Sequence, residues 1–163
     1  MTLADLNVCD RAAFVNAVGW IFEHSPWVAE RAMAHRPFAN LEALHGAMVR
    51  EVEAADPAAQ LALLRAHPDL GTRARISDAS SVEQSGAGLD RLTAEEFLRL
   101  QRLNAAYREK FGFPFLYAVK GSTKYDILMA LERRLQEAPE QEYREALRQV
   151  YRIAEFRLRE AVK

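Results

Sequence analysis

A histidine, a proline and an acid stand in a row at the end of a predicted helix. His67 follows directly on the apolar stretch of residues 60–66, and Pro68 and Asp69 come next. The dipole of a helix makes its C-terminal end negative, which favours the imidazolium form of a histidine placed there. Such a histidine titrates near neutral pH, where general acid/base catalysis is efficient. The alternative interpretation is that His67 is a C-cap that binds the last carbonyl groups of the helix.

A second polar stretch, residues 80–84, contains two hydroxyl groups, a carboxylate and an amide. Its residues are Ser80, Ser81, Val82, Glu83 and Gln84. The spacing of Ser80 and Glu83 is that of a capping box, so one interpretation is structural. The other is a ligand site, because open N–H groups at a helix start can converge with these side chains on a small polar molecule.

The last predicted helix carries an arginine close to its apolar stripe. That stripe contains Tyr143, Leu147, Val150 and Ala154. At roughly 100° per residue, Arg157 lies within about 40° of the stripe. Arginine is seldom buried unless paired, so three interpretations stay open. The side chain extends from the edge of the stripe into solvent, or it pairs with an acid, or its planar group binds an anionic ligand.

The apolar segment of residues 113–119 is the one candidate for a strand, although it is short and contains Pro114. Backbone amides that cannot join a helix must find other partners. They can line a pocket with their N–H groups towards a ligand, or the segment can simply pack its two phenylalanines in the core. The candidate ligand-holding residues are Phe115, Leu116, Tyr117, Ala118 and Val119.

Composition argues against several functional classes. The net charge is −1 and basic residues alternate with acids, which argues against nucleic-acid binding. The four histidines show no paired spacing and no Gly-rich loop follows a strand, so we expect neither a metal site nor a nucleotide cofactor. No apolar run approaches the roughly 20 residues that span a bilayer. The single cysteine, Cys9, fits a reducing compartment, so we expect a cytoplasmic protein that binds no membrane.

Almost every other segment has the apolar spacing of an amphipathic helix. The predicted helices cover residues 11–22, 27–35, 41–54 and 57–66, a long stretch from 94, a stretch from 123 to about 137, and a last one from 139. Their predicted N-caps include Asp10, Ser25, Asn40, Thr93 and Ser122. The length suits one core. We therefore predict an all-α fold, a single domain over residues 1–163 with about seven to eight helices.

Two irregular stretches, residues 67–90 and 111–121, interrupt these helices. They contain Gly71, Gly86, Gly88 and Gly112. A helical scaffold that places its irregular backbone in two loops often places its function there too. We therefore predict that these two loops form the site.

Long strings of the sequence, taken in order, resemble one family, 2-oxo-4-hydroxy-4-carboxy-5-ureidoimidazoline (OHCU) decarboxylase. The resemblance extends from about Phe14 to Leu158. The matching strings are IFEHSPW at 21–27, RPF at 36–38, QLALLRAHPDL at 60–70, EQ at 83–84 with AGL at 87–89, LNAAY at 103–107, KFGFPF at 110–115 and RL at 157–158.

The resemblance implies an activity: loss of CO2 from OHCU to give (S)-allantoin during urate breakdown. It also implies a helical bundle without a cofactor, usually a homodimer. It implies that His67 is the catalytic acid/base and that Glu83 is its polar partner at the reacting carbon. Ligand-holding roles are implied for Pro68, Ser80, Gln84, Arg157 and the backbone of residues 115–119. One departure is local: after His-Pro-Asp-Leu the family commonly has Ala-Gly, whereas this chain has Gly71, Thr72 and Arg73.

Two other functions compete with the decarboxylase. One is a lyase or hydrolase that acts on another ureide in the same pocket, although no further convergent carboxylate is visible for it. The other is a non-catalytic helical binding module, in which His67 and Glu83 are only caps. Convergence of His67, Glu83 and Arg157 on one small cavity would favour an enzyme over the module.

Overall fold

The computed structural model describes residues 1–72 and 77–163 and is all-α, as predicted. In this described part we find nine α-helices and one 3₁₀ helix, against the seven to eight predicted, and no strand. The additional helices are short. The chain forms two compact units, Met1–Ala66 with Val150–Lys163, and His67–Gln149.

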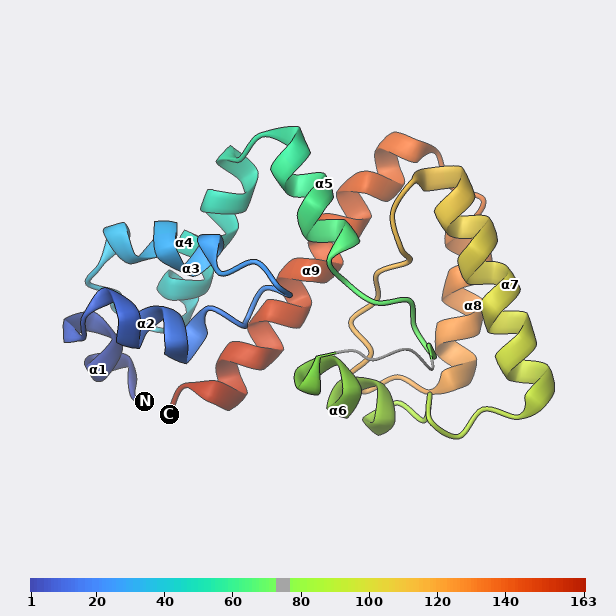
Figure 1. Cartoon of the computed structure of the whole chain (residues 1–163), viewed down its shortest axis with the longest axis horizontal. Helices are drawn as coiled ribbons and strands as arrows, with labels where there is room; N and C mark the ends of the chain where they lie inside the picture. The colour runs from blue at the N-terminus through green and yellow to red at the C-terminus, as the bar shows by residue number, and fades with distance from the viewer. Residues whose placement is uncertain (73–76) are drawn as a thin grey trace. The chain divides into compact units, whose positions relative to one another are not determined.

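The first unit consists of short helices and the C-terminal part of the last helix (Figure 1). Its elements are α1 (Leu3–Val8), α2 (Arg11–Val18), α3 (Trp27–Ala32), the 3₁₀ helix η1 (Met33–His35), α4 (Leu41–Ala54), α5 (Pro57–Arg65) and the end of α9 (Pro139–Ala161). Helix α3 packs against α2 and α4. The core of this unit includes Phe14, Leu44, Met48 and Val52, all fully buried.

Two predicted caps of the first unit are confirmed and one is wrong. The side chains of Asp10 and Asn40 accept hydrogen bonds from the N–H groups three residues later, as N-caps do. Ser25 does not cap α3: Pro26 is the N-cap residue, and the Ser25 hydroxyl donates to the Glu23 carbonyl at 2.8 Å. The hydroxyl therefore stabilises the turn before the helix.

The helix predicted over residues 11–22 is too long. Helix α2 ends at Val18, and a turn follows in which His24 has a φ of 46°. Ile21 and Phe22 are nevertheless almost fully buried. Their apolar spacing reflects packing of the turn against the core, which single-sequence periodicity cannot distinguish from a helix.

The second unit contains the helices α6 (Asp78–Gly86), α7 (Ala94–Phe111), α8 (Lys124–Arg134) and the first part of α9 (Figure 1). Helices α7 and α8 pack against each other. The predicted capping box of Thr93 and Glu96 is confirmed at the start of α7. The N-cap of α8 is Thr123, not Ser122, because Thr123 has an acid three residues later, Asp126, that completes a capping box.

The irregular stretch predicted over residues 111–121 is confirmed, whereas the one predicted over residues 67–90 contains the helix α6. One irregular stretch runs from residue 67 to α6, excluding the undescribed residues 73–76, and the other connects α7 to α8. Residues 113–119 are neither helix nor strand, so the strand candidate is wrong. His67, Pro68 and residues 115–119 lie in these stretches, whereas residues 80–84 lie in α6 and Arg157 lies in α9.

Candidate active site

The turn of residues 67–71 presents a buried histidine. His67 is 6% exposed and lies two residues after the last residue of α5. Two side chains of α7 hold the turn: Asn104 donates to the Leu70 carbonyl at 2.9 Å, and Arg108 donates to Asp69 at 2.9 Å. The position of His67 at a helix end is therefore as predicted, and the turn is fixed by groups far away in the sequence.

Gly71 closes this turn in a conformation that favours glycine. Its φ is +70°, in the left-handed region. A Cβ added there would lie 2.4 Å from Cδ2 of Leu100, which is 1% exposed. Both the backbone and the space require glycine at this position. The departure from the common Ala-Gly form therefore coincides with a left-handed turn at residue 71, while Arg73 lies outside the described residues.

Helix α6 begins three residues earlier than the capping box at Ser80 would place it. Ser77 is the N-cap, and its hydroxyl accepts from the Ser80 N–H at 3.1 Å. The interpretation of Ser80 as a cap is thus wrong, because Ser77 supplies the acceptor that this helix start needs. Ser80 instead lies in the first turn and is buried.

The predicted residues of α6 divide between a buried face and an exposed face of the helix. Ser80 and Gln84, four residues apart, are both buried on one face, and Glu83 beside them is half-buried. The side chains of Ser81 and Val82 are exposed, Val82 to 74%. If Ser81 and Val82 contact a ligand, we expect their backbone groups to make the contact.

One hydrogen bond joins the histidine turn to α6. The Gly71 N–H donates to Oε1 of Gln84 at 2.8 Å. The structure thereby brings the turn that carries His67 against the helix that carries Glu83. It also gives Gln84 a role that sequence reasoning missed, that of a tie between the two.

Residues 115–119 pack in the core, as one interpretation of the apolar segment predicted, and ligand binding by their backbone stays a prediction. Phe115, Leu116, Ala118 and Val119 are buried, and Tyr117 is half-buried. The backbone polar groups of this segment also have side-chain partners, since Ala118 N–H donates to Oε1 of Gln149 at 2.9 Å. At least one amide of this predicted ligand-holding segment is thus occupied within the chain.

A buried ionic cluster beside this segment was missed by sequence reasoning. Arg134 of α8 and Glu142 of α9 form an ion pair, with their side chains 5% and 1% exposed. Tyr107 of α7 donates to Oε1 of Glu142 at 2.5 Å. Burial, followed by this hydrogen bond, raises the pKa of Tyr107, so its hydroxyl keeps its proton. A signal was present, because Arg134 follows Ile127 and Leu131 at helical spacing on the buried face of α8.

Arg157, in the first unit, is buried and has an acidic partner. Its Nη2 lies 2.8 Å from Oε2 of Glu23, and the two side chains are 5% and 1% exposed. Its Nη1 donates to the Ile21 carbonyl at 3.2 Å. Of the three interpretations, extension into solvent is wrong and pairing with an acid is observed. Ligand binding by Arg157 stays a prediction.

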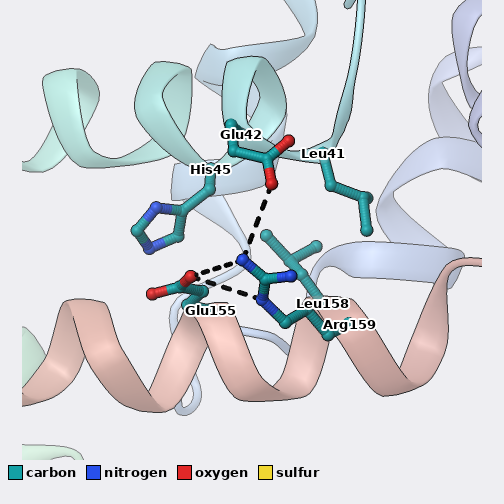
Figure 2. Close-up of a pocket in the computed structure, with 6 residues that line it drawn as sticks. All are labelled: Leu41, Glu42, His45, Glu155, Leu158 and Arg159. Carbon is teal, nitrogen blue, oxygen red and sulfur yellow. Dashed lines mark hydrogen bonds and ion pairs between the residues drawn. The ribbon is translucent and has the colours of Figure 1, made fainter.

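A small pocket of about 90 Å³ in the first unit contains none of the predicted site residues (Figure 2). It is lined by Leu41, Glu42, His45, Glu155, Leu158 and Arg159. The Arg159 guanidinium lies 2.8 Å from Glu155 and 3.5 Å from Glu42, as the dashed lines in Figure 2 show. Because two carboxylates already share this cation, the pocket is a poor site for an anionic substrate.

Outside residues 73–76, no group of three or more His, Cys, Asp or Glu side chains is arranged to hold a metal ion. In the same part of the chain, no helix combines the length and the apolar character that crossing a membrane requires.

Comparisons with known proteins point to one family. The family model described as OHCU decarboxylase matches residues 7–159. The 2-oxo-4-hydroxy-4-carboxy-5-ureidoimidazoline decarboxylase of Haloferax volcanii is 51% identical over 160 residues, which cover 98% of this chain and 95% of that protein. The uric acid degradation bifunctional protein PucL of Bacillus subtilis is 47% identical, over 99% of this chain and 33% of that longer protein.

A solved structure agrees with these sequence matches. The crystal structure of an (S)-allantoin synthase matches with a TM-score of 0.79 and 36% identity, over 99% of this chain and 54% of that chain. The range matched by the family model includes every predicted site residue, from His67 to Arg157. The chain therefore belongs to the OHCU decarboxylase family.

Proposed function

We propose that this chain catalyses the decarboxylation of OHCU to (S)-allantoin and CO2, a step of urate breakdown, without a cofactor. The observation that carries the proposal is the buried His67 on a turn tied through Gly71 and Gln84 to the helix of Glu83. Family membership and the named relatives make the chain a carboxy-lyase rather than a passive helical module.

The reaction suits a protein that supplies only positioning and one proton. The reacting carbon carries a carboxylate and a hydroxyl and adjoins a C=N bond. When the bond to the carboxylate breaks, CO2 leaves and the electron pair of that bond moves into the adjoining C=N and the ring carbonyls. A proton then adds to the former C=N carbon, which carries the ureido group and becomes the stereocentre of allantoin. The hydroxyl proton moves to the ring nitrogen that received the electron pair, and the carbon that lost CO2 becomes a carbonyl. Because the ring itself accepts the electron pair, no external electron sink is required.

His67, as the imidazolium, is the proposed proton donor to the ureido-bearing carbon. Burial keeps bulk water from competing, and the hydrogen-bonded turn holds the ring in one place. Delivery from one fixed position protonates one face, which accounts for a single enantiomer. We propose Glu83 as the polar partner at the reacting carbon, where a carboxylate close to the leaving carboxylate favours its departure by like-charge repulsion.

The remaining predicted residues are proposed to hold the ligand. Ser80 and Gln84 are buried on the same face of α6, and Pro68 adjoins His67 in the turn. We propose that the backbones of Ser81 and Val82 and of residues 115–119 contribute polar groups. We also propose that Arg157 faces the anionic or carbonyl-rich side of the substrate, with Glu23 orienting its guanidinium.

We propose that the protein is a homodimer and that it is cytoplasmic. A homodimer follows from the family resemblance, and light scattering of the purified protein should give twice the mass of one chain. A cytoplasmic location is consistent with a single, unpaired cysteine, Cys9, and with relatives that act in purine breakdown.

The experiment that tests the reaction follows chirality. The unstable substrate is generated in situ from urate, and optical activity is recorded with and without the protein. Spontaneous decay should give racemic allantoin, whereas the wild-type chain should give the (S) enantiomer quickly. His67→Asn and His67→Ala should fold but lose about 10²- to 10⁴-fold in rate, the usual contribution of a general acid/base.

The matched control is His35→Asn, which removes a more exposed histidine of the first unit that pairs with Glu51 at 2.7 Å. It should retain wild-type turnover. Near wild-type turnover in both His67 variants would remove His67 from the mechanism, and a racemic product with wild-type protein would reject the proposed reaction.

A further inference from the structure

Three buried side chains from three helices contact one another beside the segment of residues 115–119. Tyr107, Arg134 and Glu142 are at most 4% exposed. Oε1 of Glu142 accepts from Nε of Arg134 at 2.6 Å and from the Tyr107 hydroxyl at 2.5 Å. The carboxylate therefore fixes the guanidinium in one orientation.

The fixed guanidinium holds the segment in two ways. Nη1 of Arg134 donates to the Leu116 carbonyl at 2.5 Å. Its Cζ lies over the Phe115 ring, 4.6 Å from the centroid, and the Tyr107 ring meets that ring edge-on at 5.4 Å. One cation thus holds a backbone carbonyl and the preceding aromatic side chain, which sets the course of the chain at this point.

A second tie holds the segment two residues further on. Ala118 N–H donates to Oε1 of Gln149, while Nε2 of Gln149 donates to Glu145 at 3.1 Å. Since Glu145 takes the amide nitrogen, the oxygen of Gln149 must face Ala118. The segment is therefore anchored at one carbonyl and one amide.

A contribution to stability does not by itself explain why an ion pair is buried at this position. Removing two charges from water is costly, and well-packed apolar residues of the same volume are often as stable or more stable. An apolar pair would, however, leave the Leu116 carbonyl without its donor and Phe115 without its cation. What the cluster supplies, and an apolar core would not, is a defined backbone path.

We propose that Arg134 is a positioning residue for the substrate: oriented by Glu142 and Tyr107, it fixes the backbone of residues 115–119 in the form that binds the ligand. The inference rests on the proposed function, in which this backbone holds the substrate. Arg134 itself touches no substrate in this scheme and acts through the segment.

The test compares Arg134→Lys, the charge-free double variant Arg134→Met/Glu142→Leu and the control Arg133→Met. Arg133 is the exposed neighbour on the same helix, so its substitution removes a charge without reaching the segment. For each protein we would measure kcat and KM per folded molecule, the Kd for (S)-allantoin, and hydrogen exchange at the amides of residues 115–119.

We expect Arg134→Lys and the double variant to lose about 10- to 100-fold in kcat/KM, mostly through KM, because displaced binding groups misplace the substrate. Their affinity for (S)-allantoin should fall in parallel, and the amides of residues 115–119 should exchange faster while those of α7 stay protected. Arg133→Met should behave as wild type.

The proposal is overturned if the folded variants keep the wild-type KM, affinity and exchange rates, since a purely structural pair would change melting alone. If the double variant fails to fold, Arg134→Lys tests the proposal alone. Lysine keeps the positive charge beside Glu142 but lacks the planar guanidinium that reaches the Leu116 carbonyl. Hydrogen exchange separates this proposal from the reaction itself: an inactive wild type would reject the decarboxylase, while faster exchange in Arg134→Lys would still support the anchoring.

Discussion

In the part of the chain that the structure describes, each unit contains a buried arginine–glutamate pair, and the two pairs have similar contacts but different surroundings. Arg157 pairs with Glu23 and Arg134 with Glu142, and each arginine also donates to the carbonyl of an irregular segment. Glu142 has a second partner, Tyr107, whereas Glu23 lies next to a residue of positive φ, His24. In each pair, an arginine on a helix therefore fixes the position of an irregular segment. We assign ligand contact to Arg157 and support of the backbone to Arg134.

The largest expected effect comes from removing the acid of either pair. Glu23→Leu and Glu142→Leu each leave a guanidinium buried beside an apolar group, so each should lower the free energy of unfolding by about 3–5 kcal/mol. Glu142→Leu should lose about 1–2 kcal/mol more, because the buried Tyr107 hydroxyl also loses its acceptor. Urea unfolding of both variants measures this. Glu132→Leu, which removes the exposed partner of Arg99, is the control and should stay within about 1 kcal/mol of wild type. Losses equal to the control would show that neither pair is tightly buried in solution.

The second prediction separates ligand contact from structure at Arg157. If its guanidinium binds substrate, Arg157→Lys should keep the charge near Glu23 but lower kcat/KM about 10- to 100-fold per folded molecule. Arg157→Met should melt lower, because it leaves Glu23 buried without its cation, and adding Glu23→Leu should restore the melting temperature without restoring activity. Initial rates beside thermal melts measure both. Unchanged kcat and KM in Arg157→Lys, with a lower melting temperature, would make Arg157 purely structural.

A third, smaller effect is expected at the second anchor of the 115–119 segment. Gln149→Leu leaves the Ala118 N–H without its acceptor, which should cost about 1–3 kcal/mol of stability. KM should rise by less than in Arg134→Lys, because the Leu116 carbonyl keeps its donor. Gln141→Leu, on the same helix in its first turns, serves as the control. A KM that rises more than in Arg134→Lys would make Gln149 the main anchor.

The smallest effect concerns an ion pair of the second unit that lies closer to solvent. A hydrogen bond from Lys124, followed by one from the Thr93 backbone, lowers the pKa of Glu96 below its usual 4.5. A carboxyl group with a lowered pKa stabilises the fold above its unfolded pKa, and the contribution disappears as the pH falls through the folded value. The difference in melting temperature between wild type and Glu96→Gln should therefore shrink between about pH 6 and pH 3. A difference that grows on acidification would contradict the sign.

Local sequence signals predicted the helices well where a cap and an apolar stripe agree. Asn40 and the Thr93 capping box gave helix starts that the structure confirms. Errors arose where a neighbouring residue competes for the same role, as Thr123 does with Ser122 and Ser77 with Ser80. At α8 a linear signal was available, because Asp126 stands three residues after Thr123. At α6 both Ser77 and Ser80 can cap, and the backbone conformation that decides between them is not contained in a linear pattern.

The candidate site could be located from the sequence, but its supports could not. His67 and most of residues 80–84 stand out in the sequence because they are polar and lie in a stretch that was predicted to be irregular. The ties that hold them, such as Gly71 to Gln84 and Asn104 to Leu70, join a side chain to a backbone group 13 and 34 residues away. A backbone N–H or carbonyl looks the same at every position, so no residue type marks these partners. Arg134 was missed because it stands in the run Glu132, Arg133, Arg134, and basic residues beside an acid are typical of a solvated helix surface.

The anchoring of the histidine turn also has a consequence for the order of events during synthesis. His67 and its neighbours leave the ribosome before the groups that hold them, since Asn104 follows Leu70 by 34 residues and Arg108 follows Asp69 by 39. At typical elongation rates of about 5–20 residues per second, about 2–8 s pass between the synthesis of Asp69 and that of its partner Arg108. A nascent chain that stops before α7 contains His67 and Glu83 and yet none of the α7 contacts that hold the histidine turn. This turn should therefore become ordered late, after both the histidine and the helix before it have been made.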